Sequence, residues 1–494
     1  MAKSVLLGVA LIGSTSVDLQ IVNKKSGKVL EKVHHSISLD NDIYVAGYAA
    51  DEQINYLIKM LLRFQQLLAD YNVEHFHVWG AYSLASAQNA MYISARIQQA
   101  TGLKVEWLSA SQEAYYGQAS MRYGDQNFPK ADEKVFLMSM SSGRLSLGYY
   151  IAGKLQFTRN INLGPIRLAS QLEELEDEVV DLEGLVREFI NSKLADYNYL
   201  LPIFDAADLL LVSGSLTLER TLTMPIVDTA DFLKSNQRIL NDPRQKWVNE
   251  YHFTAVQTDT IMMELLLMES FVKATKARQI GISQQHILPG IVLDETGQLT
   301  GDEVLVHAFE LSRRFQVEPK HQAAVLHFSE QLFDRMKAVH GLDKRSRLLL
   351  QVAALVHDVG SYLNSYHHYE NSETIILADE IDGLTPLEMR MVALIAHYHS
   401  YETPGAALEN VTGLTESAQI KVIKLAALLR LADALDDSRL QKISKITVSM
   451  KNEEIELTGY SHEKLYLEQW TFEEKANLFE KIFGRQIILK RKAV

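Results

Sequence analysis

The chain contains no cysteine in its 494 residues. Disulfides, zinc–thiolate sites, iron–sulfur clusters and thiol nucleophiles are therefore excluded. Any metal must be bound by histidine, aspartate or glutamate. Such a nitrogen and oxygen shell favours Mn, Fe, Zn or Mg.

Long apolar runs are absent as well. The most hydrophobic stretch near the start, residues 5–12, is far shorter than the roughly 18 residues that a membrane-spanning helix needs. Only Lys3 precedes it, and no small-x-small cleavage site follows, so it lacks the form of a secretion signal. It continues into an alternating pattern at residues 17–22, which predicts a buried strand, a turn at 13–15 and a second strand. We expect a cytoplasmic protein with no membrane partner.

Basic residues are in the minority. The chain has 49 Lys and Arg against 62 Asp and Glu, which gives a net charge of −13. A net acidic protein is a poor non-specific partner for nucleic acid or an anionic membrane, because like charges repel. No nucleic-acid partner is expected, and a polyanionic substrate would need a local basic groove.

The pattern of the chain changes near residue 300. Its length exceeds one ordinary hydrophobic core, and its 47% hydrophobic and 22% charged content is that of a soluble globular protein. Before residue 300, predicted strands at 75–79, 103–108, 135–140, 145–151 and 209–212 alternate with predicted helices at 51–70, 83–100 and 258–278. Residues 302–440 have helical period almost throughout. The end predicts strands at 444–450, 454–458 and 485–489 and a helix at 473–483.

The dipeptide His357-Asp358 carries the most chemical information. It lies between His321 upstream and Asp433 downstream, and each histidine or aspartate site falls on an apolar stripe with helical spacing. A buried, unpaired carboxylate costs roughly several kcal/mol, so such groups are normally paired or bound to metal. One hypothesis is a shared metal site that activates water for attack on phosphorus. The alternative is that each polar residue caps or bridges its own helix.

Four segments in this order resemble the long form of the exopolyphosphatase/guanosine-pentaphosphate phosphohydrolase family. They are His321 with Val325, residues 352–360 (VAALVHDVG), His367-His368 with 396–399 (AHYH), and 428–436 (LLRLADALD). One departure is Glu370, where longer members usually repeat a histidine after the His-His pair. A carboxylate there can still accept a hydrogen bond beside a ligand.

The resemblance implies a fold class of α/β plus all-α. It implies two actin-like, ribonuclease-H-like lobes at 1–122 and 123–300, an α-helical HD-type domain at 301–442 and a small α+β C-terminal domain at 443–494. In the HD-type domain it implies metal binding by His321, His357, Asp358 and Asp433. His367, His368 and His399 would then contact phosphate or support the ligands, and Arg430 would offset substrate charge.

The actin-like part departs from the family in its chemistry. Leu11 replaces the aspartate of the first phosphate turn, and residues 139–146 (SMSSGRLS) lack the aspartate, two glycines and the glutamate of the second. Ala85 replaces a phosphate-binding arginine. Gln112 stands at the catalytic glutamate and cannot act as a general base. Glu113 survives as a catalytic candidate only with a shift of one residue.

Three functions remain open from the sequence. The first is a metal-dependent phosphohydrolase working at the HD centre through Asp358, on a phosphorylated small molecule. The second is an active exopolyphosphatase with an atypical site and polyphosphate as substrate. The third is a non-catalytic regulator that binds a phosphorylated ligand, with the actin-like part kept for shape, ligand sensing or the homodimer that we expect.

Overall fold

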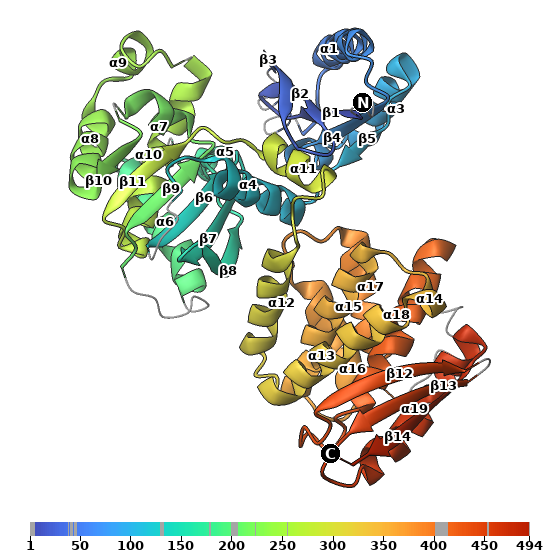
Figure 1. Cartoon of the computed structure of the whole chain (residues 1–494). Helices are drawn as coiled ribbons and strands as arrows, with labels where there is room; N and C mark the ends of the chain where they lie inside the picture. The colour runs from blue at the N-terminus through green and yellow to red at the C-terminus, as the bar shows by residue number, and fades with distance from the viewer. Residues whose placement is uncertain are drawn as a thin grey trace. The chain divides into compact units, whose positions relative to one another are not determined.

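The computed structural model describes residues 5–37, 39, 43, 47–128, 133–176, 179–198, 206–222, 224–253, 255–400, 413–451 and 454–493. The chain forms two compact units, Met1–Thr300 and Gly301–Val494 (Figure 1). Within the described ranges, no helix is long and apolar enough to cross a membrane. The finer boundaries predicted at 122/123 and 442/443 stay predictions, and the first of these falls inside a helix, α4 (Ala110–Gly124).

The first sheet of unit one has five strands in the order β3-β2-β1-β4-β5. Its strands are β1 (Leu6–Ile12), β2 (Ser16–Asn23), β3 (Val29–Ser36), β4 (His75–Gly80) and β5 (Val105–Trp107), and its helices are α1 (Asp51–Asp70), α2 (Tyr82–Ala85) and α3 (Ala90–Thr101). The apolar run of β1 lies at the centre of this sheet, antiparallel to β2 and parallel to β4. Ile54, Leu57 and Leu61 of α1 join the same buried core. The predicted strand–turn–strand at the start of the chain is confirmed.

The single helix predicted at 83–100 is wrong, because the structure has two helices with a break between them. The break is made by Asn89, whose side chain accepts the backbone N–H of Ala49 at 3.0 Å and donates to the Ala49 carbonyl at 2.8 Å. Gln88 N–H adds a bond to the carbonyl of Gly47 at 2.9 Å. These tertiary bonds to an extended segment override the local helical preference.

The second sheet has six strands in the order β10-β11-β9-β6-β7-β8. The strands are β6 (Lys134–Met140), β7 (Leu145–Ile151), β8 (Lys154–Ile161), β9 (Leu209–Ser213), β10 (Ile226–Asp228) and β11 (Gln279–Ser283). The helices are α4 (Ala110–Gly124), α5 (Pro165–Glu176), α6 (Leu182–Asn198), α7 (Leu216–Thr221), α8 (Thr229–Asn241), α9 (Arg244–Asn249), α10 (Ala255–Thr275) and α11 (Ile287–Glu295).

Helix α10 ends three residues earlier than the prediction of 258–278. Lys276 has a positive φ of 51°, which stops the helix, and Arg278 N–H already bonds to the carbonyl of Ala207 beside the sheet. The chain then enters β11, which the sequence pattern did not reveal.

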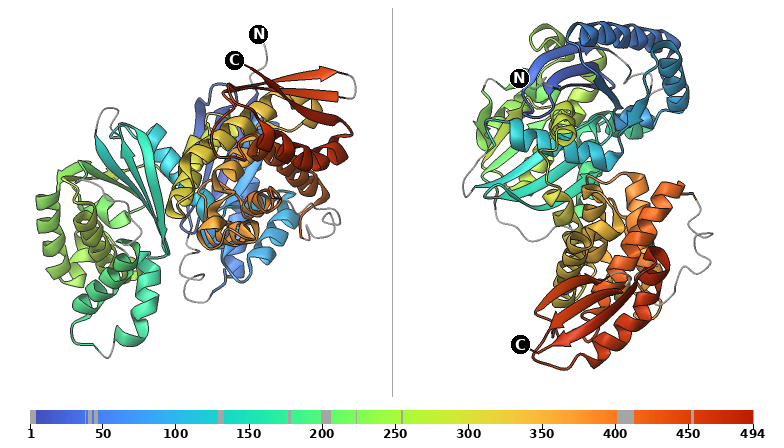
Figure 2. Two further views of the ribbon diagram at one scale, coloured as in Figure 1. Left: turned by 90° about the horizontal axis from the view of Figure 1, so that it is seen from below. Right: turned by 45° about the vertical axis from the view of Figure 1, so that its right-hand side comes forward.

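Between residues 301 and 444, each regular element that the structure describes in unit two is a helix. Its helices are α12 (Asp302–Arg314), α13 (Pro319–Arg335), α14 (Lys337–His340), α15 (Lys344–Val356), the 3-10 helix η2 (Val359–Tyr362), α16 (His368–Ala378), α17 (Pro386–His397) and α18 (Glu416–Ala434). The chain ends with β12 (Lys445–Lys451), β13 (Glu454–Tyr460), α19 (Tyr466–Phe483) and β14 (Gln486–Lys492), and the strands form one sheet in the order β12-β13-β14 (Figure 2). The predicted terminal strands are confirmed. Helix α19 begins seven residues before the predicted helix at 473.

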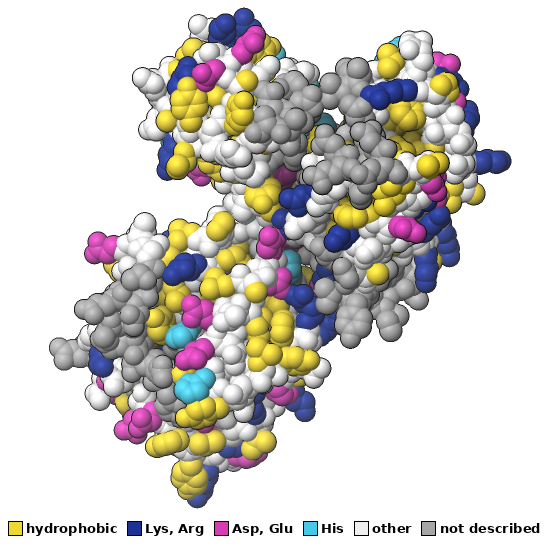
Figure 3. Space-filling model, turned by 180° about the vertical axis from the view of Figure 1, so that it is seen from behind, with side chains coloured by type: hydrophobic (Ala, Val, Ile, Leu, Met, Phe, Trp, Pro, Cys, Tyr) yellow, Lys and Arg dark blue, Asp and Glu magenta, His cyan; other side chains and the backbone are white. Residues whose placement is uncertain are grey.

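The surface carries charges of both signs. On the face shown in Figure 3, acidic, basic and apolar side chains are interspersed. Such a mixed surface is ordinary for a globular protein, so the buried polar residues of unit two are more informative about function.

Candidate functional site

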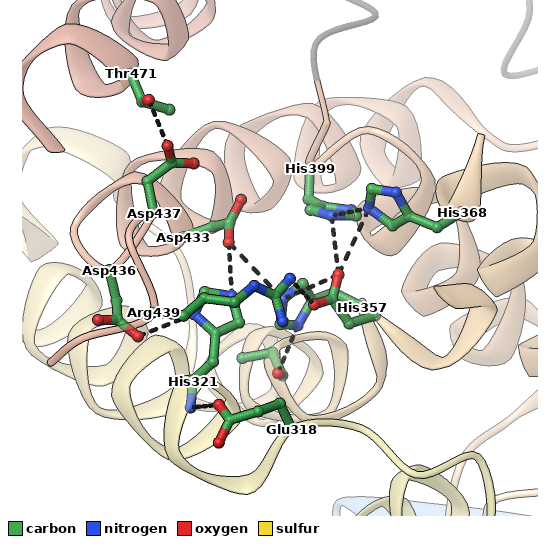
Figure 4. A network of polar contacts seen from close by, with 12 residues as sticks. Glu318, His321, His357, His368, His399, Asp433, Asp436, Asp437, Arg439 and Thr471 are labelled. Carbon is green, nitrogen blue, oxygen red and sulfur yellow. Dashed lines mark hydrogen bonds and ion pairs between the residues drawn. The ribbon is translucent and has the colours of Figure 1, made fainter. Parts of the chain in front are cut away.

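Three helices of unit two bring the four predicted ligands together. His321 lies on α13, His357 caps the C-terminal end of α15, and Asp433 lies near the end of α18. His321 Nε2 is 3.1 Å from Asp433 Oδ1, and His357 Nε2 is 3.6 Å from Asp358 Oδ1 and 3.9 Å from Asp433 Oδ1 (Figure 4). Donor atoms bound to one ion at about 2.1 Å lie roughly 3 to 4 Å apart. The four side chains therefore lie in one buried cluster, and their role as metal ligands stays a prediction.

A second group shares one residue with the first. His368 Nε2 and His399 Nε2 lie 3.1 Å apart, and each faces Asp358 Oδ1, at 3.5 and 3.7 Å. His321, His357 and Asp358 form one set able to hold an ion, and Asp358, His368 and His399 form another. Asp358 Oδ1 is therefore common to both sets. His368 and His399, predicted as substrate contacts, lie in positions suited to ligands.

In two of the histidines, His357 and His399, a hydrogen bond from Nδ1–H leaves Nε2 as an acceptor. Nδ1–H of His357 donates to the carbonyl of Ala354 at 2.9 Å, and Nδ1–H of His399 donates to the carbonyl of Ala396. The Nε2 lone pair of each then points into the cluster, and His357 Nε2 is buried without a hydrogen-bond partner. Burial lowers the pKa of both imidazoles, that of His399 to about 3. Neutral imidazoles oriented by a carbonyl are the metal-binding form, so these residues fit a divalent ion.

His321 is held differently. Its Nε2–H and Nδ1–H both donate to carboxylates, those of Asp433 at 3.1 Å and Asp436 at 3.0 Å. Burial alone would lower its pKa, but the two hydrogen-bonded carboxylates raise the pKa of His321 to about 9. An ion bound to His321 would therefore have to displace a proton.

Each inner carboxylate turns its second oxygen to a cation. Asp358 Oδ2 accepts from Arg439 at 2.7 Å, and Asp433 Oδ2 accepts from Lys475 of α19. Burial would raise both carboxyl pKa values. The guanidinium of Arg439 and the neighbouring imidazoles instead hold the pKa of Asp358 well below its usual range, and Lys475 does the same for Asp433. Both carboxylates are thus ionised, with one oxygen each left facing the histidines.

The turn that carries Asp358 depends on glycine. A Cβ on Gly360 would lie 2.0 Å from the carbonyl oxygen of His368 and 2.4 Å from the nitrogen of Ser372, so only glycine allows α16 to approach so closely. Ser372 Oγ donates to the carbonyl of His357 at 2.6 Å and accepts from Gly360 N–H at 2.9 Å. Ser372 thereby fixes the turn between two ligands.

Two residues predicted to contact substrate lie elsewhere. Arg430 is buried, and its guanidinium donates to the carbonyls of Tyr398, at 3.3 Å, and Ser400. It supports the chain on both sides of His399. His367 is exposed, and its Nδ1 lies 2.8 Å from the hydroxyl of Tyr369, away from the ligand groups.

Three residues of the cluster were missed by sequence reasoning. Asp436 follows Asp433 by one helical turn, and that spacing was a usable signal. Arg439, whose side chain is 49% exposed, reaches Asp358 because its backbone has a φ of 57°. Lys475 comes from a separate segment of the chain, and no local pattern marks it.

The residues that the sequence places at an actin-like phosphate site are engaged in structural bonds. Gln112 is the third residue of α4, and its side chain and that of Ser109 form a reciprocal capping box. Glu113 accepts the backbone N–H of Tyr82 at 2.8 Å, and burial raises the pKa of its carboxyl although Arg144 opposes this.

The loop that would cradle phosphate is also occupied by the chain itself. The first amide groups of α5, on Ile166 and Arg167, donate to the carbonyl of Ser142 at 3.0 and 3.2 Å. A helix N-terminus binds an anion through such free N–H groups, and here they are taken. Leu11, at the place of a metal-binding aspartate, is a buried strand residue.

Comparison with known proteins gives one family-model match and several similar solved structures. Residues 307–478 match the family model of the Ppx/GppA phosphatase, domain III. An exopolyphosphatase from Cytophaga hutchinsonii is similar over 60% of this chain and 99% of its own, with 14% identity and a TM-score of 0.50. A Ppx/GppA family member from Aquifex aeolicus is similar over 60% of this chain and 98% of its own, with 17% identity and a TM-score of 0.47. The mixed α/β, actin-like fold of the N-terminal part and the helical region after it both agree with the predicted fold class.

Proposed function

We propose that the chain is a Ppx/GppA-family protein whose hydrolytic chemistry resides in the histidine–aspartate cluster of unit two, an HD-type centre, and not in its actin-like cleft. Its substrate would be a small phosphorylated molecule. The observation that carries this proposal is the pair of ligand sets that share Asp358, with the lone pairs of His357 and His399 directed inward. A divalent ion bound there would supply an activated water and neutralise phosphoryl charge.

The position of each residue in the cluster indicates its proposed role. His357, Asp358 and Asp433 would bind an ion, with His321 joining after loss of its proton, and His368 and His399 would complete the second set. Mn, Fe and Zn suit this mixed nitrogen and oxygen shell better than Mg. Arg439 is half exposed while most of the cluster is buried, so it is the cation that an arriving phosphoryl group would meet.

The proposed loss of function in the cleft rests on three contacts. The side chain of Gln112 is used in a helix cap, Glu113 is bound to a backbone amide, and the N-terminal amides of α5 are closed by Ser142. An active exopolyphosphatase site would have to rearrange all three. The predicted cytoplasmic location and homodimer also stay proposals.

A non-catalytic binding protein is the second candidate. The observation that favours it is the internal charge pairing of the cluster, in which Arg439 and Lys475 already neutralise Asp358 and Asp433. Such a cluster can be stable without an ion, and its role would then be structural or regulatory.

Metal analysis and phosphate release together decide between these functions. Purified protein is assayed for bound metal, and then for phosphate release from polyphosphate, guanosine tetra- and pentaphosphate and simple phosphomonoesters. Metal-dependent activity that is lost in Asp358→Ala and kept in Glu113→Gln supports the proposal. The reverse pattern would assign the chemistry to the cleft. Metal-free, inactive protein that binds a phosphorylated ligand would favour the second candidate.

A further inference from the structure

Helix α19 presents a buried polar stripe to the rest of unit two. Glu468, Thr471 and Lys475 are spaced so that they share one face of the helix, and they are 1%, 0% and 4% exposed. Phe472, also on α19, is equally buried in the apolar part of the packing. Buried ionisable side chains are costly unless they are paired, so the partners of this stripe are informative.

The four partner residues of this stripe all lie on one short segment that begins in the last turn of α18. Lys475 Nζ donates to Asp433 Oδ2. Thr471 Oγ1 donates to Asp437 Oδ2 at 2.8 Å (Figure 4). Glu468 accepts from Ser438 and from Lys442, the latter at 3.1 and 3.3 Å. Helix α19 therefore bonds to residues 433–442 at both ends of this segment and in its middle.

The segment 433–442 also contributes residues to the candidate metal centre. It supplies Asp433 as a ligand candidate, Asp436 as the partner of His321, and Arg439 as the partner of Asp358. The stripe on α19 thus contacts the reverse side of the same residues that face the histidines.

Lys475 has the most direct effect on a ligand. A carboxylate can rotate about its Cβ–Cγ bond, and the ammonium of Lys475 holds Oδ2 of Asp433 so that Oδ1 stays 3.1 Å from His321 Nε2 and 3.9 Å from His357 Nε2. We propose that Lys475 is a positioning residue of the metal centre, which acts through Asp433 and makes helix α19 an integral part of that centre. The inference rests on the proposed metal-binding function.

The opposite role for Lys475 makes a contrary prediction. An ammonium beside a carboxylate can also compete with a metal ion for it, because both are cations. Removal of a competitor would tighten metal binding, whereas removal of a positioning group would weaken it. The sign of the change in affinity therefore distinguishes the two roles.

The test is Mn²⁺ binding to the full chain after removal of metal by a chelator. Lys475→Met keeps an unbranched side chain, shorter by one atom, and removes its charge. We expect its dissociation constant for Mn²⁺ to rise about tenfold or more, as when a partner that orients a metal ligand is removed. An unchanged or lower dissociation constant would overturn the inference.

The matched control is Lys442→Met. Lys442 also pairs with α19 in a buried ion pair, with 12% of its side chain exposed against 5% for Lys475, but it touches no ligand candidate. If Lys475 acted only by docking the helix, both variants would weaken Mn²⁺ binding alike. We expect Lys442→Met to lower the thermal midpoint while changing the dissociation constant less than Lys475→Met does.

A second variant covers the case in which Lys475→Met does not fold. In Lys475→Ala, added n-propylammonium should restore Mn²⁺ affinity, and the uncharged n-propanol of similar size should not. Equal effects of the two additives would contradict a role for the charge. Wild-type protein that binds no Mn²⁺ would reject the proposed function itself, whereas wild-type binding equal to that of Lys475→Met rejects the role of Lys475 alone.

Discussion

The histidines of the cluster differ in how they are prepared for a ligand. His357 and His399 have their tautomer set by a carbonyl three residues earlier in the chain, so their inner nitrogens need no change before they bind an ion. His321 instead keeps two protons between two carboxylates. Binding of an ion to His321 would therefore require loss of one proton from its imidazole. The protonation of His321 thus distinguishes metal-free from metal-bound protein.

Asp358 should be the most sensitive position for metal binding. Its Oδ1 is common to both ligand sets, so Asp358→Ala removes a donor from each. We expect metal affinity to fall on the order of 100-fold or more, with any phosphohydrolase activity lost. Circular dichroism should show an intact fold. Retained stoichiometric metal in this variant would mean that the ion binds elsewhere.

The empty centre should make stability depend on pH. The pKa of His321 is raised from 6.5 to about 9 in the folded chain. Its contribution is fully present below pH 6.5, where both states are protonated, and is lost as pH rises through 9, because the unfolded chain releases its proton first. Urea unfolding in EDTA should show a loss of about 3 kcal/mol across this range. His321→Gln should flatten that loss, and a wild-type curve without it would show that the imidazole is neutral.

Two arginines near the cluster should behave oppositely. Arg430→Met removes a donor to two backbone carbonyls, at Tyr398 and Ser400, so it should destabilise the protein by about 2 to 4 kcal/mol. Arg439→Met removes the partner of Asp358, which still faces the imidazoles of the cluster, so it should destabilise the protein less than Arg430→Met while lowering kcat/KM by about 10- to 100-fold. Denaturant titrations and steady-state kinetics on both variants measure the two effects. A stability loss in Arg439→Met as large as that of Arg430→Met would remove the case for a substrate contact.

Helical period in the sequence predicted inward-facing polar residues, and the resemblance to a known family grouped them into one candidate centre. The stripes that end in His321, His357 and Asp433 predicted helices whose polar ends face inward, and α13, α15 and α18 carry those residues into contact. What the period could not supply was the partner from another element. Helix α19 was predicted from residue 473, which leaves out the turn that contains Glu468 and Thr471. Its amphipathic pattern is weakened there because the buried face is polar.

The same limit applies in the actin-like part. The pattern at 83–100 predicted one helix, since nothing local indicates that Asn89 bonds to the backbone of Ala49, 40 residues earlier. Long-range hydrogen bonds of this kind are outside the reach of periodicity. The substitutions at Leu11, Ala85 and Gln112 were legible from sequence, whereas the closure of the α5 amides by Ser142 needed the structure.

The phosphate site predicted in the actin-like part should have no polyphosphatase activity. The carboxylate of Glu113 accepts the Tyr82 amide, so it is poorly placed as a base. Polyphosphate hydrolysis by the full chain should be absent or very weak, and Glu113→Gln should not change it. Magnesium-dependent hydrolysis that is abolished by Glu113→Gln but kept in Asp358→Ala would show that the surviving glutamate is the base.

The two units carry different kinds of information about function. A solved structure that is similar over 60% of the chain shares 14% identity, which speaks for the fold alone, while the family model covers residues 307–478 of unit two. All candidate ligands and their cationic partners lie in unit two, from His321 to Lys475. The candidate chemistry therefore requires nothing from Met1–Thr300 that the described contacts reveal.

Unit two should bind metal when it is produced alone. It has its own buried core and contains each member of both ligand sets, so we expect the fragment 301–494 to bind Mn²⁺ with the affinity of the full chain. A fragment that stops at the predicted boundary, 301–442, lacks α19 and with it the bond from Lys475 to Asp433. Its affinity should fall by about tenfold or more even if circular dichroism shows retained helix. Calorimetric titration of both fragments measures this difference. Equal affinity in the two would place the metal centre wholly within the helical part, and weak binding by both would mean that unit one contributes to the site.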